Sequence, residues 1–110
     1  MTSEASSVRI AFTTVGSAEE ARRLARRLVE RRLAACVNIV PNLTSIYHWK
    51  GAIEEASEVL LMMKTTAALL PQLEAAVREL HSYEVPEFLA LDVASIAQPY
   101  LDWLLSSVNQ

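Results

Sequence analysis

The stretch CVNIVPNLTSIYHWKGAIEEASEVLLMMKTT, from Cys36 to Thr66, decides the fold. It predicts two long β-strands joined by a tight turn at Lys50-Gly51. Strands of about 14 residues, at roughly 3.3 Å per residue, span about 45 Å. A compact domain of this length has a diameter of only roughly 35 Å. We therefore expect the hairpin to project beyond its own domain and to expose strand edges that another chain can pair with.

Five consecutive apolar residues, Val59-Leu60-Leu61-Met62-Met63, lie in the second arm of this hairpin. Side chains alternate between the two faces of a strand, so Val59, Leu61 and Met63 are expected on one face and Leu60 and Met62 on the other. A strand that is apolar on both faces is covered on both. A chain this short covers one face with its own helices, which leaves the other for a second subunit.

The remaining elements follow from apolar spacing and from capping residues. We expect a strand at Val8–Val15, a helix from Ser17 to Arg32–Ala35 opened by a Ser17/Glu20 capping box, a helix at Ala67–His81, a strand at Val85–Ala94 that is apolar on both faces, and a helix at Gln98–Val108. Pro41-Asn42 predicts a bulge or bend in the first hairpin arm. The order βαββαβ with a C-terminal helix indicates an α+β, ferredoxin-like fold. Residues 1–7 are expected to form a flexible N-terminal tail, and residues 8–110 a single domain.

Composition narrows the classes of function. The 110 residues carry a net charge of −3 and one cysteine, so no internal disulfide can form. Six arginines lie between Arg22 and Arg32, but interleaved glutamates and the acidic chain favour a solvated helix face over a nucleic-acid surface. No apolar run approaches the roughly 20 residues that a membrane span needs, and no signal peptide is visible. A cytoplasmic protein that binds neither nucleic acid nor membrane is expected.

Four segments closely resemble the CutA divalent-cation-tolerance family: LAACVNIVPNLTSIYHWKG, IEEASEVLLMMKT, ELHSYEVPE and YLDWL. The resemblance covers nearly the whole chain from Val8 to Leu105. It implies a ferredoxin-like subunit in a homotrimer similar to the PII-type signalling proteins, and an association with copper and other divalent metals. It implies no reaction. Two residues depart from the family pattern, Ala52 in place of a lysine and Ser82 in place of a proline, and the second is expected to loosen the turn before the last strand.

Cys36 and His81 are the candidate metal ligands. A thiolate is a soft ligand, and with an imidazole it suits Cu(II) or Zn(II). Cys36 can equally be a small buried apolar residue, and His81 a positive residue at a helix C-terminus. Glu84 or Glu58 would have to complete the coordination, because no paired His/Cys spacing occurs within one element. Any site is therefore expected to be weak, with Cu(II) or another divalent metal as its ion. It is expected to be dispensable for folding, because the core and the trimer interface already supply the burial.

A ligand cleft between subunits is the second candidate site. Lys64 follows a run of apolar residues and needs a carboxylate or an anion, unless it extends to water at the strand end. A cleft that combined it with Tyr83 and Glu84 would suit a small anion or a metal complex. The candidate lining residues are Tyr47, Trp49, Glu58, Lys64 and Tyr83, although packing is the alternative role of the aromatic ones. His48 is expected at the surface.

Three classes of function remain open from the sequence. The first is a trimeric metal-responsive or small-ligand-binding protein with sites at its subunit boundaries. The second is an enzyme of unknown reaction that uses Cys36 or Lys64 with His81, although no Ser-His-Asp set or glycine-rich phosphate loop supports it. The third is a structural trimer that anchors a partner protein.

Overall fold

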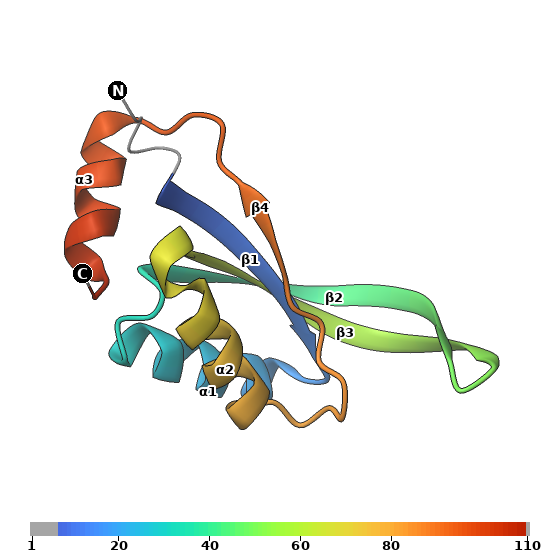
Figure 1. Ribbon diagram of the computed structural model, residues 1–110. Helices are drawn as coiled ribbons and strands as arrows, with labels where there is room; N and C mark the ends of the chain where they lie inside the picture. The colour runs from blue at the N-terminus through green and yellow to red at the C-terminus, as the bar shows by residue number, and fades with distance from the viewer. Residues whose placement is uncertain (1–6, 110) are drawn as a thin grey trace.

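The computed structural model describes residues 7–109. The elements, drawn in Figure 1, are β1 (Val8–Val15), α1 (Ala18–Glu30), β2 (Cys36–Trp49), β3 (Ala52–Thr66), the 3₁₀ turn η2 (Ala67–Leu69), α2 (Leu70–Leu80), β4 (Leu89–Asp92) and α3 (Gln98–Ser107). The expected flexible tail at residues 1–7 lies, apart from Ser7, outside the described residues. No helix within residues 7–109 is long and apolar enough to cross a membrane.

The four strands form one antiparallel sheet in the order β2-β3-β1-β4. Helices α1 and α2 lie together on one face of this sheet, and α3 lies at the end where β1 begins (Figure 1). This is the α+β, ferredoxin-like arrangement that the sequence predicts, and the prediction is confirmed.

The long hairpin is present as predicted. Its arms contain 14 and 15 residues, and Lys50 and Gly51 connect them with φ values of 51° and 82°. Two positive φ values in a two-residue connection define the type I′ turn, whose twist matches that of the flanking strands. The register shifts between Val40 and Leu43, where Asn42 has a φ of 65°, so the expected bulge follows Pro41. The hairpin extends the molecule to 48 × 26 × 23 Å.

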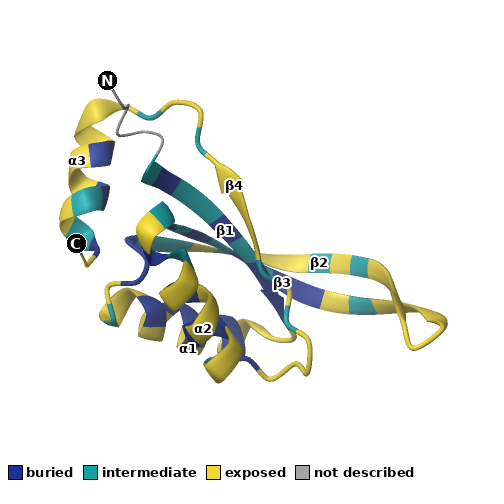
Figure 2. Cartoon of the chain, in the orientation of Figure 1, coloured by how far each residue is buried: buried dark blue, intermediate teal, exposed yellow. Residues whose placement is uncertain are grey.

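The core lies between the sheet and α1 and α2. Val59, Leu61 and Met63 are 7%, 0% and 0% exposed and face these helices, as predicted. Leu60 and Met62 point to the opposite face and are partly exposed. Figure 2 shows the buried residues along β1, β3 and the helices, and the exposed outer half of the hairpin. By the strand register, the opposite face also carries Ile10, Phe12, Val40, Leu89 and Leu91.

The last strand differs from the prediction. It spans Leu89–Asp92 rather than Val85–Ala94, and all of its residues are exposed. Pro86 has no N–H to donate to a ladder, and the edge of β1 at Thr14 is already bonded to His81, so pairing begins only at Leu89. The apolar character of β4 therefore reflects a sheet face that residues 7–109 leave uncovered. The other boundaries agree within a few residues, except that the second helix opens with η2.

Candidate functional site

The turn after α2 is fixed to the edge of β1 through His81. Its Nε2 lies 2.7 Å from the Thr14 carbonyl oxygen, and its Nδ1 accepts the Tyr83 backbone N–H at 3.0 Å. Because Nδ1 accepts, the proton belongs on Nε2, which donates to Thr14. The side chain is fully buried. Both ring nitrogens are thus occupied within the chain, and a metal would have to displace the Tyr83 N–H to reach Nδ1.

Glu20 anchors the next residue of the same turn. Its carboxylate accepts the Ser82 backbone N–H at 3.1 Å and the Ser82 hydroxyl at 3.0 Å, and it lies 3.9 Å from the His81 Nδ1. The Ser17 hydroxyl accepts the Glu20 N–H at 3.1 Å, so the predicted N-cap of α1 is confirmed. The glutamate half of that capping box is used elsewhere, since its side chain turns to Ser82. Ser82 therefore secures the turn that its departure from the family pattern was expected to loosen.

Tyr83 extends from this turn to β3. Its hydroxyl donates to Glu58 Oε2 at 2.7 Å, and Glu58 is only 7% exposed. Burial raises the pKa of the Tyr83 phenol, and the hydrogen bond to Glu58 and the Glu58 charge raise it further. Tyr83 is therefore a neutral donor that satisfies a buried carboxylate.

Ser82, Tyr83 and Glu58 border a cleft of about 740 Å³ between this turn and the outer half of the hairpin. The lining residues come from β1, β2, β3 and the segment before β4, and they are Thr14, Ser45, Ile46, Tyr47, Trp49, Glu58, Ser82, Tyr83, Glu84, Val85 and Glu87. Burial raises the pKa of the Glu87 carboxyl, and the nearby Glu58 charge adds to this effect. The cleft thus combines aromatic rings with acidic side chains.

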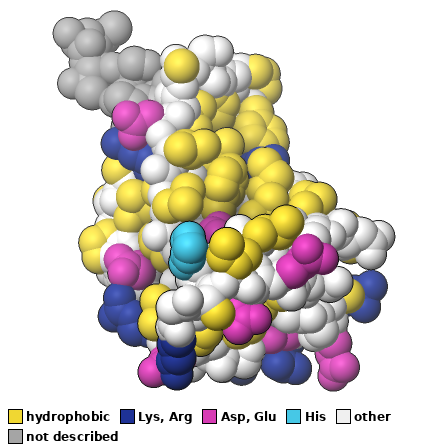
Figure 3. Space-filling model, turned by 90° about the vertical axis from the view of Figure 1, so that its right-hand side faces the viewer, with side chains coloured by type: hydrophobic (Ala, Val, Ile, Leu, Met, Phe, Trp, Pro, Cys, Tyr) yellow, Lys and Arg dark blue, Asp and Glu magenta, His cyan; other side chains and the backbone are white. Residues whose placement is uncertain are grey.

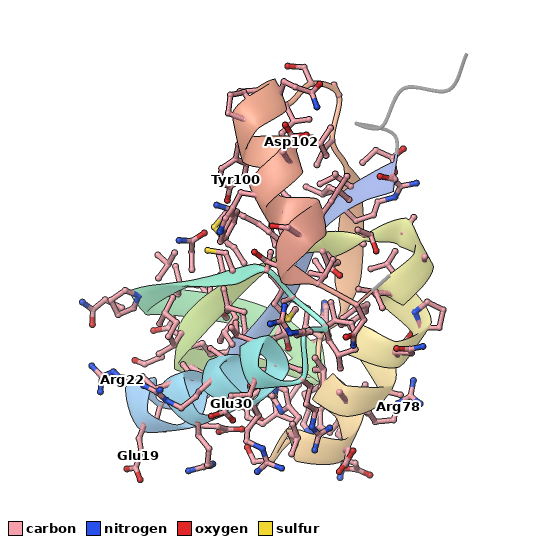
Figure 4. The ribbon with its side chains drawn as sticks, turned by 90° about the vertical axis from the view of Figure 1, so that its left-hand side faces the viewer. Glu19, Arg22, Glu30, Arg78, Tyr100 and Asp102 are labelled. Atoms are coloured by element: carbon pink, nitrogen blue, oxygen red, sulfur yellow. The ribbon has the colours of Figure 1, made fainter. Side chains whose placement is uncertain are left out.

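The sequence groups Lys64 with this cleft, but the structure places it elsewhere. Lys64 lies opposite Cys36 in the β2–β3 register, and its Nζ is 5.6 Å from the centre of the Tyr100 ring. Tyr100 projects from α3 at that end of the sheet (Figure 4). Thr14 lies opposite Leu60, about four residues along β3 from Lys64, which is roughly 13 Å. The lysine is stabilised by an aromatic face instead of the carboxylate or anion that its position suggested.

Cys36 is likewise distant from the cleft. Its thiol is partly exposed on the sheet face that α1 and α2 leave uncovered, and its Sγ lies 3.8 Å from Asn38 Oδ1. The candidate ligands Cys36, His81 and Glu84 are therefore not brought together within one chain. Among residues 7–109, no group of three or more His, Cys, Asp or Glu side chains is arranged to hold a metal ion.

Of the candidate cleft residues, Tyr47, Trp49, Glu58 and Tyr83 do line one cavity, together with Glu84. Sequence reasoning missed Glu87 as a lining residue and the role of Glu20. The role of Glu20 could have been suspected, because Glu20 lies next to Ala21 on the buried side of α1, where a carboxylate needs a partner. Glu87 falls inside the predicted strand Val85–Ala94, whereas the structure places it in the irregular segment before β4. His48 is exposed near the hairpin tip, as predicted.

Comparison with known proteins gives a consistent result. A family model described as CutA1 divalent ion tolerance protein matches residues 9–107. The divalent-cation tolerance protein CutA of Thermus thermophilus is 54% identical over 95 residues, which are 86% of this chain and 92% of that protein. Mouse protein CutA is 53% identical over 98 residues, which are 89% of this chain and 55% of the mouse protein. The chain thus spans about half the length of the mouse relative.

Solved structures agree with these matches. The divalent cation tolerance protein Cut A1 from Thermus thermophilus superposes with a TM-score of 0.90 at 50% identity, covering 93% of this chain and 99% of that one. The crystal structure of CutA1 from Oryza sativa superposes with a TM-score of 0.93 at 38% identity, covering 98% and 99%. The resemblance found in the sequence motifs is confirmed.

Proposed function

Because the chain belongs to the CutA1 divalent ion tolerance family, we propose that it works as a metal-responsive homotrimer. In this proposal, Cu(II) or another divalent metal binds weakly at or near the subunit boundaries, and the cleft beside the outer half of the hairpin holds a small ligand. The observation that carries the proposal is the apolar sheet face that α1 and α2 leave uncovered, because it holds both the surface for assembly and the one thiol.

Two features support the trimer. Leu89 and Leu91 are 46% and 50% exposed on the uncovered face, where Leu60 and Met62 are also partly open. Viewed along the hairpin, hydrophobic side chains gather in a broad patch (Figure 3). An apolar patch of this kind indicates a contact surface. A projecting hairpin that pairs with the next copy head to tail closes into a ring, and three copies are the assembly that we propose.

Cys36 supports metal binding at the boundary. It lies on the uncovered face beside Asn38 and Lys64, so neighbouring subunits would approach its thiol. A thiolate needs further ligands, and since one chain does not bring three together, water or groups from a neighbour must supply them. His81 and Glu84 remain the other candidates. His81 requires a local rearrangement, whereas Glu84 is exposed in the wall of the cleft.

A cytoplasmic location completes the proposal. An unpaired thiol that binds metal has to stay reduced, which suits a reducing compartment. Relatives in Arabidopsis thaliana and rice are named chloroplastic, so compartments differ between the relatives. Fractionation of the source cells tests this part.

Light scattering and copper calorimetry on the same sample test the main proposal. We expect about three subunit masses at micromolar protein, weak Cu(II) binding, and loss of that binding in Cys36→Ser. Protons compete with metal for a thiolate or an imidazole, so affinity is expected to fall as pH is lowered. His81→Gln tests the second candidate and keeps a polar side chain in the turn. A monomeric protein contradicts the assembly, and unchanged copper affinity in both variants removes both residues from the site.

A further inference from the structure

We infer that the cleft between the turn after α2 and the outer half of the hairpin binds a small organic cation, an alkylammonium or guanidinium, whose charge is held by Glu58 and Glu87 and whose carbon chain lies against the Tyr47 ring. The inference deepens the proposed function, because it rests on the proposal that this cleft is a binding site. It depends neither on a bound metal nor on Cys36.

The charge of the lining selects the sign of the ligand. Glu58, Glu84 and Glu87 line the cleft, and none of its lining residues within the described part of the chain is Lys, Arg or His. Lys64, which would have favoured an anion, lies at the other end of the sheet beside Tyr100. Burial raises the pKa of the Glu87 carboxyl and the nearby Glu58 charge raises it further, so these two carboxylates, which line the same cleft, repel each other. A cation placed between them relieves that repulsion, whereas an anion increases it.

The burial of Glu58 strengthens the effect. Only 7% of the residue is exposed, and of its two carboxylate oxygens Oε2 accepts the Tyr83 hydroxyl. A carboxylate oxygen has two lone pairs, so the group retains capacity for a charged donor. Hydrogen bonds between ionised partners are about twice as strong as neutral ones, and more so where water is excluded. Tyr83 holds the carboxylate in place for such a donor.

The aromatic rings select an organic cation over a metal ion. Tyr47, Trp49 and Tyr83 line the same cleft, and aromatic faces attract ammonium and guanidinium groups and cover attached methylenes. Trp49 already illustrates this, because the Lys50 ammonium lies 5.5 Å from the centre of its ring. A hard divalent cation instead needs several converging oxygens, and residues 7–109 contain no such group of three. The volume of about 740 Å³ falls within the range of small-molecule sites.

Calorimetry on the full chain in its native assembly, with EDTA present to remove metal, tests the inference. The probes are 1,4-diaminobutane, agmatine and the neutral control 1,4-butanediol. We expect saturable binding of at least one of the two cations, with at most one per chain, and no binding of the diol. Glu58→Gln is expected to weaken that binding at least tenfold, and Tyr47→Leu severalfold. Glu30→Gln removes the same charge from an exposed residue at the C-terminal end of α1 (Figure 4), and it is expected to leave cation binding unchanged.

Several results would overturn the inference, and the first three concern the probes and the variants. The first is that the diamine, agmatine and the diol all bind alike or all fail to bind. The second is that Glu58→Gln and Tyr47→Leu both bind the cation as tightly as wild type. The third is that Glu30→Gln weakens cation binding as much as the cleft variants do. If Glu58→Gln does not fold, Tyr47→Leu decides, because Tyr47 is 42% exposed and contributes little to the core. Cys36→Ser separates this inference from the metal proposal. If Cys36→Ser still binds the cation, the cleft is a site separate from the metal site. If Cys36→Ser no longer binds the cation, the inference of a separate site is wrong. Intact copper binding without cation binding overturns only the present inference.

Discussion

Replacing Leu61 by glutamate is expected to unfold the domain, whereas replacing Leu60 by glutamate is expected to leave each chain folded and to prevent assembly. The two residues are neighbours in β3 and have the same chemistry. They differ in the face they occupy, since Leu61 is 0% exposed against the helices and Leu60 is partly open on the uncovered face. The pair therefore separates the stability of one chain from the association of several.

The magnitudes follow from burial. Leu61→Glu loses about 1.5–3 kcal/mol of apolar burial, and an unpaired carboxyl trapped in the core costs several kcal/mol more. The sum approaches the roughly 5–15 kcal/mol stability of a typical domain. In an isolated Leu60→Glu chain the new carboxylate can reach water, so that substitution is expected to change the stability of a monomer by at most about 1 kcal/mol. In the proposed trimer, the same carboxylate would be desolvated in every subunit.

Circular dichroism melting and light scattering measure the two effects separately. Leu61→Glu should show little cooperative unfolding at 25 °C, and Leu60→Glu should melt cooperatively as a particle of one subunit mass. Leu60→Ala is the matched control, because it shortens the side chain without adding charge and should assemble more weakly than wild type but better than Leu60→Glu. If Leu60→Glu assembles as wild type does, the uncovered face is open to water and the proposed interface is wrong.

Four further outcomes are expected. The pKa of Tyr83 is raised above its usual value of 10.0, so the unfolded chain releases this proton at a lower pH than the folded chain does. The stabilising effect of Tyr83 should therefore be lost as pH rises above about 10. In urea titrations there, the difference in free energy of unfolding between wild type and Tyr83→Phe should shrink. The pKa of Glu87 is raised above 4.5, so its ionisation costs stability as pH rises, and Glu87→Gln should be more stable than wild type at pH 7 but not at pH 3. Thr13 is fully buried and its hydroxyl has no hydrogen-bond partner among the described residues, so Thr13→Val should gain up to about 1 kcal/mol in chemical denaturation. A chelator should leave the melting temperature and the particle mass nearly unchanged, since the core contains no metal ligand set among residues 7–109, and chelator-induced unfolding would instead make the metal structural.

The parts of the fold that repeat a simple pattern could be predicted from the sequence. The bounds of β1 agree with the prediction, and the hairpin, its turn and its bulge follow from Lys50-Gly51 and Pro41-Asn42. β4 could not be bounded in this way, because its apolar residues indicate burial while a single chain leaves them exposed. The sequence shows that a residue needs covering, but it does not state whether the cover comes from the same chain.

The candidate site was predictable by residue type more than by position. Tyr47, Glu58 and Tyr83 come from separate elements and do meet in one cleft, whereas Lys64 does not join them. Which strand position reaches the cleft depends on the register after the bulge and on the path of the turn between α2 and β4. Neither has a period that a sequence pattern can reveal. Because Lys64 does not line this cleft, the ligand that we propose is a cation, whereas the sequence favoured a small anion or a metal complex.

The turn between α2 and β4 shows how a departure from a family pattern can be compensated. A proline at position 82 would have no N–H and no hydroxyl, and the buried Glu20 carboxylate would lose both of its donors from that residue. Ser82 supplies both, at 3.1 Å and 3.0 Å. Three consecutive residues are thereby fixed to three elements: His81 to β1, Ser82 to α1 and Tyr83 to β3. Because hydrogen bonds to charged carboxylates are worth more than neutral ones, the contacts of Ser82 and Tyr83 in particular fix the wall of the cleft. For the ligand that we propose, a wall fixed in advance would lower the entropic cost of binding.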